Sequence, residues 1–452
     1  MSQNNGGLSR REFLKQAAAL GSLPILSGLE LVLGKEAHAQ TIGKSAVQEY
    51  NLSTGQLSTT DFAQRFASPN EYLQHLTGIN FRDEDLMDSL LGTVHNGADF
   101  TYFNQTNGSV VDSLERRVDV GSIIQGLTGV SAVKTRALKF PGYGSLLMVY
   151  DGRTHIHGIK IGSELTPIGD ITNIFKEMFG FVPVDMISAN YINNGTSPHD
   201  DALALKRHNG DWIVYPYPFS PSQASRFDLE GIFQDPSLGS IISLGAFNLN
   251  GSLIDKLYAI RHRLEGIIDA QTASDVITYN QDNINLSSYR RLGIIAKWDL
   301  PVPVYVDPSI DKRNVDEALW QNFLETGISY VLIDQDETPR VLFRAGTDGL
   351  GGVALARGGV DGVYPNNRAK SGLVVIHPNY AQYDPNFLFI YRHEFRHALG
   401  FFGHLRLEGL ISVITPLIAQ RENNVLKALY FQMPHGARVE ADGSWRVMIN
   451  TD

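Results

Sequence analysis

The segment FIYRHEFRHALGFFGHLRLEG (389–409) places three of the chain's 13 histidines and one glutamate within twelve residues. On an α-helix, residues four apart lie on one face, so the imidazoles of His393 and His397 could reach the same ion. Glu394 lies about 100° around the helix from His393, where its carboxylate can approach a water beside the metal instead of the metal itself. This is the H-E-x-x-H pattern of zinc hydrolases, in which zinc lowers the pKa of a water and the glutamate accepts its proton.

The residues after this pair predict a third ligand. Gly400 suits a point where a helix stops and the chain reverses, and His404 offers another ring nitrogen from the returning chain. Catalytic zinc sites hold three protein ligands and keep a fourth position open. We therefore expect a Zn²⁺ site formed by His393, His397 and His404, since zinc suits neutral imidazoles and is redox-inert. Glu394 would be the catalytic general base. The alternative is a solvated surface helix that matches the motif by chance.

The composition narrows the other possibilities. The chain has no cysteine, which excludes disulfides, thiolate catalysis and cysteine-based zinc sites. Its formal net charge of −10 does not suggest a nucleic-acid partner. With 452 residues, 43% of them hydrophobic, the chain can form a sizeable core and is too long for one ordinary domain.

The N-terminus resembles a twin-arginine (Tat) export signal. Arg10 and Arg11 precede a modestly apolar stretch at 17–33, and Ala-His-Ala at 37–39 fits a small-x-small cleavage site. We expect residues 1–39 to be a signal peptide, and the bacterial protein to be periplasmic or secreted. An uncleaved membrane anchor is the alternative. Because no later segment is long and apolar enough to cross a bilayer, we expect no membrane span after signal removal.

Residues 40–295 predict a mixed α and β region whose fold and function the sequence does not identify. The segments 146–161 and 203–217 are typical of β-hairpins, with alternating runs around an Asp-Gly or Asn-Gly turn. A short helix is expected at 60–76. The segment 251–273 carries apolar residues at helical spacing and predicts a longer helix.

Residues 296–452 predict a second domain, so the fold class expected for the chain is α+β. A helix is expected from Asn314, which with Glu317 forms a capping box, to Gly327. A second helix carries the histidines. The natural packing is a mixed sheet backed by these two helices, with strands at 296–311, 339–345 and 371–378.

The histidine segment resembles the active-site run of the metzincin metallopeptidases, H-E-x-x-H-x-x-G-x-x-H, and within them the matrixins. HEFRHALGFFGH is close to a matrixin HEFGHALGLxH run, and the likeness extends in order from Lys297 to the C-terminus. The resemblance implies a zinc endopeptidase that cleaves a protein or peptide substrate. It implies that Glu394 takes the water proton and passes it to the leaving amine. The substrate strand would pair with an edge strand at 353–356.

Two departures from the family pattern matter for the site. The third histidine of the pattern lies ten residues after the first, where this chain has Gly403, and His404 comes one residue later. The extra residue lies past Gly400, in a turn, where insertions cost little. Ile414 stands where metzincins have a methionine beneath the metal; it can supply an apolar floor, although its branching differs. Neither change removes a catalytic atom, and both leave open a divergent or weak enzyme.

Other candidates have less support. His155 and His157 could bind a metal from one face of a strand, although a surface or core pair is the favoured interpretation.

Two further functions stay open: a non-catalytic exported binding or adhesion protein that retains a metzincin fold, and a zinc hydrolase acting on a non-peptide amide. Substrate specificity, the latency mechanism, the oligomeric state and the role of 40–295 are not determined. Loop carboxylates could supply oxygens for Ca²⁺, as comparable loops do in matrixins, although solvated turns are the favoured interpretation: Asp334, Asp336, Glu337, Asp348 and Asp361.

Overall fold

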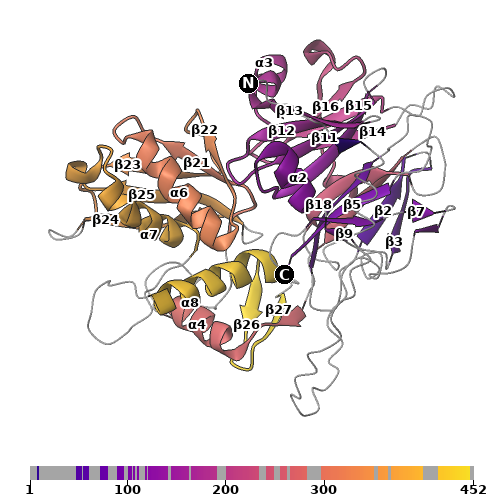
Figure 1. The fold of residues 1–452 in the computed structure, drawn as a ribbon. Coiled ribbons are helices and arrows are strands. Elements are labelled where there is room, and N and C mark those ends of the chain that lie inside the picture. The colour runs from indigo at the N-terminus through magenta and orange to yellow at the C-terminus, as the bar shows by residue number, and fades with distance from the viewer. Residues whose placement is uncertain are drawn as a thin grey trace. The chain divides into compact units, whose positions relative to one another are not determined.

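The computed structural model describes residues 8–9, 47–52, 54–60, 72–79, 89–95, 100–103, 105–106, 109–110, 118–119, 121–140, 144–161, 164–190, 200–233, 241–248, 255–261, 265–281, 297–350, 355–364, 368–400 and 416–447. The chain divides into two compact units. Unit 1 consists of Met1–Asp151, His155–Asp235 and Ile241–His262, and unit 2 consists of Gly152–Thr154, Pro236–Ser240 and Arg263–Asp452. Each unit combines helices with β-sheets, which confirms the α+β class (Figure 1).

The main division lies earlier than residue 296, where the sequence predicted the domain boundary. β20 (Glu265–Ile267) pairs with β27 (Ser444–Val447), close to the C-terminus. Asp275 of α4 (Ala270–Gln281) accepts a 3.0 Å hydrogen bond from Nε of Arg421 of α8 (Pro416–Lys427). The chain from Arg263 onward belongs to unit 2 because its partners lie there.

Unit 1 is built from antiparallel sheets. The helices among its described residues are α2 (Gly121–Thr128) and α3 (Thr172–Phe179), with short 3-10 turns η3 (Pro221–Gln223) and η4 (Gly231–Phe233). Its strands are β1 (Leu8–Ser9), β2 (Val47–Asn51), β3 (Gln56–Thr60), β4 (Tyr72–Ile79), β5 (Ser89–His95), β6 (Phe100–Phe103), β7 (Gln105–Thr106), β8 (Ser109–Val110), β9 (Val118–Asp119), β10 (Lys134–Phe140), β11 (Gly144–Tyr150), β12 (Ile156–Ile161), β13 (Glu164–Asp170), β14 (Asp185–Ala189), β15 (Ala202–Lys206), β16 (Trp212–Pro216), β17 (Ser225–Phe227), β18 (Ile241–Phe247) and β19 (Lys256–Arg261). The strand orders are β1-β13-β12-β11-β10, β14-β15-β16-β17, β18-β19-β2-β3, β4-β5-β6-β9 and β7-β8.

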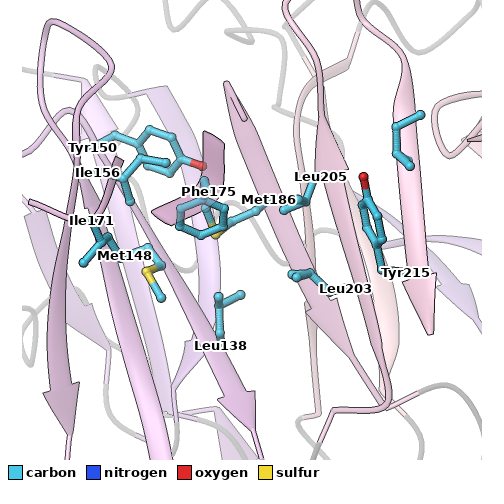
Figure 2. Packing of buried hydrophobic residues seen from close by; sticks show 11 residues of the cluster. Leu138, Met148, Tyr150, Ile156, Ile171, Phe175, Met186, Leu203, Leu205 and Tyr215 are labelled. Carbon is cyan, nitrogen blue, oxygen red and sulfur yellow. The ribbon is translucent and has the colours of Figure 1, made fainter. Parts of the chain in front are cut away.

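Three strands of the five-stranded sheet of unit 1, β10, β11 and β12, are largely buried on both faces. Successive residues of a strand point to opposite faces, so Leu147 and Val149 of β11 join a cluster that includes Ile123 of α2. Met148 and Tyr150 of the same strand point into a second cluster shared with the sheet of β14, β15 and β16. Figure 2 shows this second cluster, which comprises Leu138, Met148, Tyr150, Ile156, Ile171, Phe175, Met186, Leu203, Leu205, Ile213 and Tyr215. These three strands therefore form an interior layer of unit 1, whereas β13 is largely exposed.

Both hairpins predicted in this region are confirmed. β11 pairs with β12 and β15 pairs with β16, and Gly210 adopts a φ of 93° in the second turn. The helix predicted at 251–273 is wrong, because β19 occupies Lys256–Arg261 and pairs with β2 and β18. Four successive residues, Leu257 to Ile260, are buried, so this strand is covered on both faces and its apolar run lacks the alternation typical of a strand. The helix predicted at 60–76 is also wrong over its last residues, which belong to β4; residues 61–71 lie outside the described ranges.

Unit 2 contains the mixed sheet predicted for the C-terminal region. Its strands are β21 (Val302–Val306), β22 (Tyr330–Ile333), β23 (Arg340–Ala345), β24 (Ala356–Val363) and β25 (Ala369–Ile376), in the order β22-β21-β23-β25-β24. Neighbours are parallel except β24, which runs antiparallel to β25 at one edge. The strand β22 was not predicted. The two expected helices, α6 (Lys312–Thr326) and α7 (Leu388–Ala398), contact each other, and α7 contacts β24 and β25.

The first helix of this sheet domain starts earlier than the sequence predicted. Asp311 caps α6 by accepting a 3.0 Å hydrogen bond from the Arg313 N–H, so the capping box of Asn314 and Glu317 is wrong. Asn314 is instead fully buried, and its amide bonds to the backbone of the segment that leads to α7. Gly327 ends α6 at a φ of 75°, as predicted.

The rest of unit 2 packs around α4 and α8. A π-helical turn, η8 (Ala428–Gln432), continues α8, and β26 (Ala437–Val439) completes the three-stranded sheet β20-β27-β26. Two 3-10 turns, η6 (Pro378–Tyr380) and η7 (Pro385–Phe387), connect β25 to α7. Across the described residues, no helix combines the length and apolar character needed to cross a membrane.

Candidate metal centre

The helix α7 holds the H-E-x-x-H segment, and its inner face anchors it to the sheet. Tyr391 and Phe395, one turn apart, are both fully buried. Their rings pack against Phe343 of β23 at centroid distances of 6.4 and 6.1 Å. This packing leaves the intervening positions of α7, including His393 and Glu394, to face other directions.

The end of α7 is held by hydrogen bonds from two aromatic residues. The indole N–H of Trp298 donates to the carbonyl oxygen of Ala398 at 2.7 Å, and the hydroxyl of Tyr430 donates to that of Leu399 at 2.8 Å. The last carbonyls of a helix lack partners within the helix, so these bonds satisfy groups that would otherwise be buried without one. Gly400 follows at a φ of 104°, which confirms the predicted turn.

The two histidines of the motif converge on one point. Nε2 of His393 lies 3.1 Å from Nε2 of His397, and the ring planes are nearly perpendicular at 86°. Two nitrogen ligands about 2.0–2.1 Å from a tetrahedral zinc lie roughly 3.3 Å apart. The pair therefore fits a shared metal ion within a few tenths of an ångström. A direct hydrogen bond between two neutral imidazoles would give a similar distance.

Glu394 is buried beside the edge strand β24. The N–H of Gly358 hydrogen-bonds to its carboxylate. Burial raises the pKa of Glu394 to about 7, and the Gly358 bond opposes that shift. A carboxyl group with this pKa can both accept and release a proton near neutral pH.

The structure describes only part of the predicted site. His404 lies in 401–415, outside the described residues, as do Gly403 and Ile414. Within the described ranges, no three His, Asp or Glu side chains are grouped so that they could hold a metal ion. The predicted edge strand at 353–356 needs correction, because the described strand β24 begins at Ala356 and runs to Val363, and residues 351–354 are not described.

The other predicted candidates do not form metal sites in the described chain. Oδ2 of Asp151 approaches both His155 and His157, at 3.4 Å from Nδ1 and 3.7 Å from Nε2, respectively. At these distances each histidine forms an ion pair with Asp151 only when its ring is protonated. Two of the carboxylates considered for Ca²⁺ instead form ion pairs with arginines four residues away: Asp336 with Arg340 and Asp348 with Arg344.

The residues that support α7 were not predicted from the sequence. Gly358 lies in a glycine-rich segment, but nothing local indicates that its N–H reaches Glu394. Trp298 is about 100 positions from Ala398 in the sequence. Arg396 lies inside the motif, at a position where the matrixin run has glycine. This difference was the one feature of the sequence that pointed to a supporting residue. No family model matches the chain, and no curated protein matches it.

Proposed function

We propose that the chain is an exported zinc-dependent endopeptidase whose site is carried by α7 and β24 of unit 2. The observation that carries the proposal is the convergence of the His393 and His397 Nε2 atoms at 3.1 Å, with the buried Glu394 beside them. A matrixin-like domain is further supported by an antiparallel edge strand lying next to the histidine helix.

In this proposal His393, His397 and His404 hold the zinc ion. When bound, zinc supplies Lewis acidity, which polarises a carbonyl and makes water a better nucleophile at neutral pH. Glu394 accepts a proton from the attacking water at its carboxylate and delivers it to the nitrogen of the leaving amine. Its burial, together with the Gly358 N–H, holds the carboxylate in one orientation.

A peptide substrate would bind in extended form along β24. In the described sheet this strand pairs with β25 and lies at the edge, so a substrate strand would add along its other side. Glycines at 358, 359 and 362 leave this strand with few side chains to obstruct a substrate. The substrate's scissile bond would lie near Glu394, because Gly358 is bonded to that residue.

The experiment measures bound metal and protein digestion in the wild type and two variants. Glu394→Gln keeps the shape of the side chain but removes the proton acceptor, and we expect it to retain stoichiometric zinc and lose about 10²–10⁴ in the rate of casein or gelatin cleavage. Glu317→Gln is the matched control: the same substitution in unit 2, at a half-buried residue whose carboxylate accepts a hydrogen bond from the Tyr383 hydroxyl. We expect that variant to cleave at the wild-type rate.

Equal cleavage by the wild type and Glu394→Gln would assign the activity to another site. A wild type that binds zinc and cleaves neither protein substrates nor a panel of simple amides would favour the alternative, a non-catalytic exported binding or adhesion protein. Cleavage of the amides alone would indicate a non-peptide hydrolase.

A further inference from the structure

Arg396 lies at the centre of a buried polar network that joins three helices. Its side chain is 4% exposed. Nε donates to Oδ1 of Asn322 at 3.1 Å, and one terminal nitrogen donates to Oε2 of Glu422 at 2.9 Å. The other terminal nitrogen donates to Oε2 of Glu325 at 2.6 Å and to Oδ1 of Asn423 at 2.7 Å. Asn322 and Glu325 belong to α6, whereas Glu422 and Asn423 belong to α8.

A buried charge network of this kind is not an efficient source of stability. Removing a guanidinium and a carboxylate from water costs free energy that their attraction repays only with good geometry, and apolar replacements of similar size are often as stable. What the planar guanidinium provides is direction, because its donors form a rigid fork that must meet each acceptor at a fixed angle. Arg396 therefore restrains α7 against both rotation and sliding relative to α6 and α8.

This restraint acts directly on the metal-binding pair. Arg396 precedes His397 by one residue and follows His393 by three, so any rotation of α7 that breaks the Arg396 bonds moves both imidazoles as well. The restraint also reaches α8, which starts twelve residues after His404 in the sequence. Arg396 thus links the helix that carries two predicted ligands to the helix that follows the third.

We propose that Arg396 is a positioning residue for the metal centre, setting α7 against α6 and α8 so that the ligand nitrogens meet at one point. The proposal rests on the zinc function proposed above. It assigns a role to the position at which this chain has arginine and the matrixin run has glycine. The neighbouring Arg392 provides a contrast, since it bonds at 2.5 Å to the other carboxylate oxygen of Glu325, on α6.

The test uses the full chain purified as apoprotein and compares three variants with the wild type. The double variant Arg396→Met, Glu422→Gln removes the guanidinium without leaving the buried Glu422 as an unpaired charge. Arg396→Lys keeps a positive charge but has only one nitrogen to donate from. Arg392→Met is the matched control on the same helix. Each protein is measured for apoprotein melting temperature, zinc affinity by chelator competition, and the visible spectrum after loading with Co²⁺.

We expect the double variant and Arg396→Lys to melt within a few degrees of the wild type yet to bind zinc more weakly, by roughly 10–100-fold, the range known for residues that orient metal ligands. Their Co²⁺ spectra should change in intensity, because the ligand geometry is altered. Arg392→Met should keep both the wild-type affinity and the wild-type spectrum. A purely structural role would lower the melting temperature and leave the spectrum of the folded protein unchanged.

Wild-type affinity and spectrum in both Arg396 variants would overturn this inference and leave the zinc function standing. Weaker binding in Arg392→Met to the same extent would also overturn it, because the effect would then belong to α7 in general. If the wild type itself takes up no stoichiometric zinc, the proposed function fails.

Discussion

Gly358 on β24 packs so closely against Glu394 on α7 that a methyl group added at position 358 would overlap the Glu394 carbonyl oxygen. The same glycine bonds through its N–H to the Glu394 carboxylate. The edge strand and the helix therefore meet at a spacing that only glycine permits, and this spacing brings a backbone donor to the proposed general base.

Substituting Gly358 by alanine should separate β24 from α7. Overpacking of this kind costs about 1–3 kcal/mol, and displacement of a catalytic group by about 1 Å can cost about 10²-fold in rate. The measurements are the free energy of unfolding and the rate of casein cleavage. Gly359→Ala is the matched control, because a Cβ at that position has no neighbour within 4 Å. Equal effects of the two substitutions would contradict the close contact.

Replacing His404 by alanine should lower zinc occupancy while leaving His393 and His397 in place. Two ligands hold zinc less tightly than three, and catalytic sites use three protein ligands. Metal analysis after dialysis against a weak chelator measures the effect. His208→Ala, in unit 1, serves as the control for loss of a histidine. Undiminished zinc in the His404 variant would indicate that another residue supplies the third ligand.

Asp185 should make unit 1 sensitive to acid. Burial raises the pKa of Asp185, but the guanidinium of Arg136 at 2.7 Å and the ammonium of Lys134 at 3.2 Å outweigh burial and hold the pKa well below its usual range. Because the folded pKa is lower than the unfolded one, about 3.9, this ionisation stabilises the fold above about pH 4, and the stabilisation is lost as the pH falls further.

Asp185→Asn leaves two buried cations without their counter-charge and should cost about 3–5 kcal/mol at neutral pH. The difference in the free energy of unfolding between wild type and variant should narrow as the pH falls from about 5 toward 2. Urea unfolding of the full chain, followed by a signal from unit 1, measures it. Asp211→Asn is the control, since Asp211 pairs at 3.4 Å with the exposed Arg226 and should cost less than about 1 kcal/mol. If this difference in the free energy of unfolding does not depend on pH, Asp185 is not ionised in the folded protein.

Changing Arg10 and Arg11 together to lysine should keep the precursor in the cytoplasm. The prediction rests on the arginine pair ahead of a weakly apolar stretch. Cell fractionation with an antibody to the chain locates the protein, and Lys15→Arg, which preserves the pair, should be exported normally. Export of the double-lysine form would exclude the twin-arginine route.

Structural features that depend on only a few neighbouring residues could be predicted from the sequence. The end of α6 at Gly327, the turn at Gly400 and the hairpin at Gly210 all depend on a backbone conformation that glycine adopts readily. The i, i+4 spacing of His393 and His397 follows from helix geometry, so the pair could be placed on one face before the fold was known.

Only the tertiary structure decided the features that join distant segments. The stretch Lys256–Arg261 became β19 because β2, about 200 residues earlier, pairs with it, and such pairing overrides a local helical pattern. Gly358, Trp298 and the partners of Arg396 lie on other elements than α7, and their roles arise only when the sheet and helices pack. The sequence by itself therefore determined which residues could hold a metal and accept a proton, since that chemistry is local. The fold determined which groups hold them in place, because those contacts depend on chain segments meeting in three dimensions.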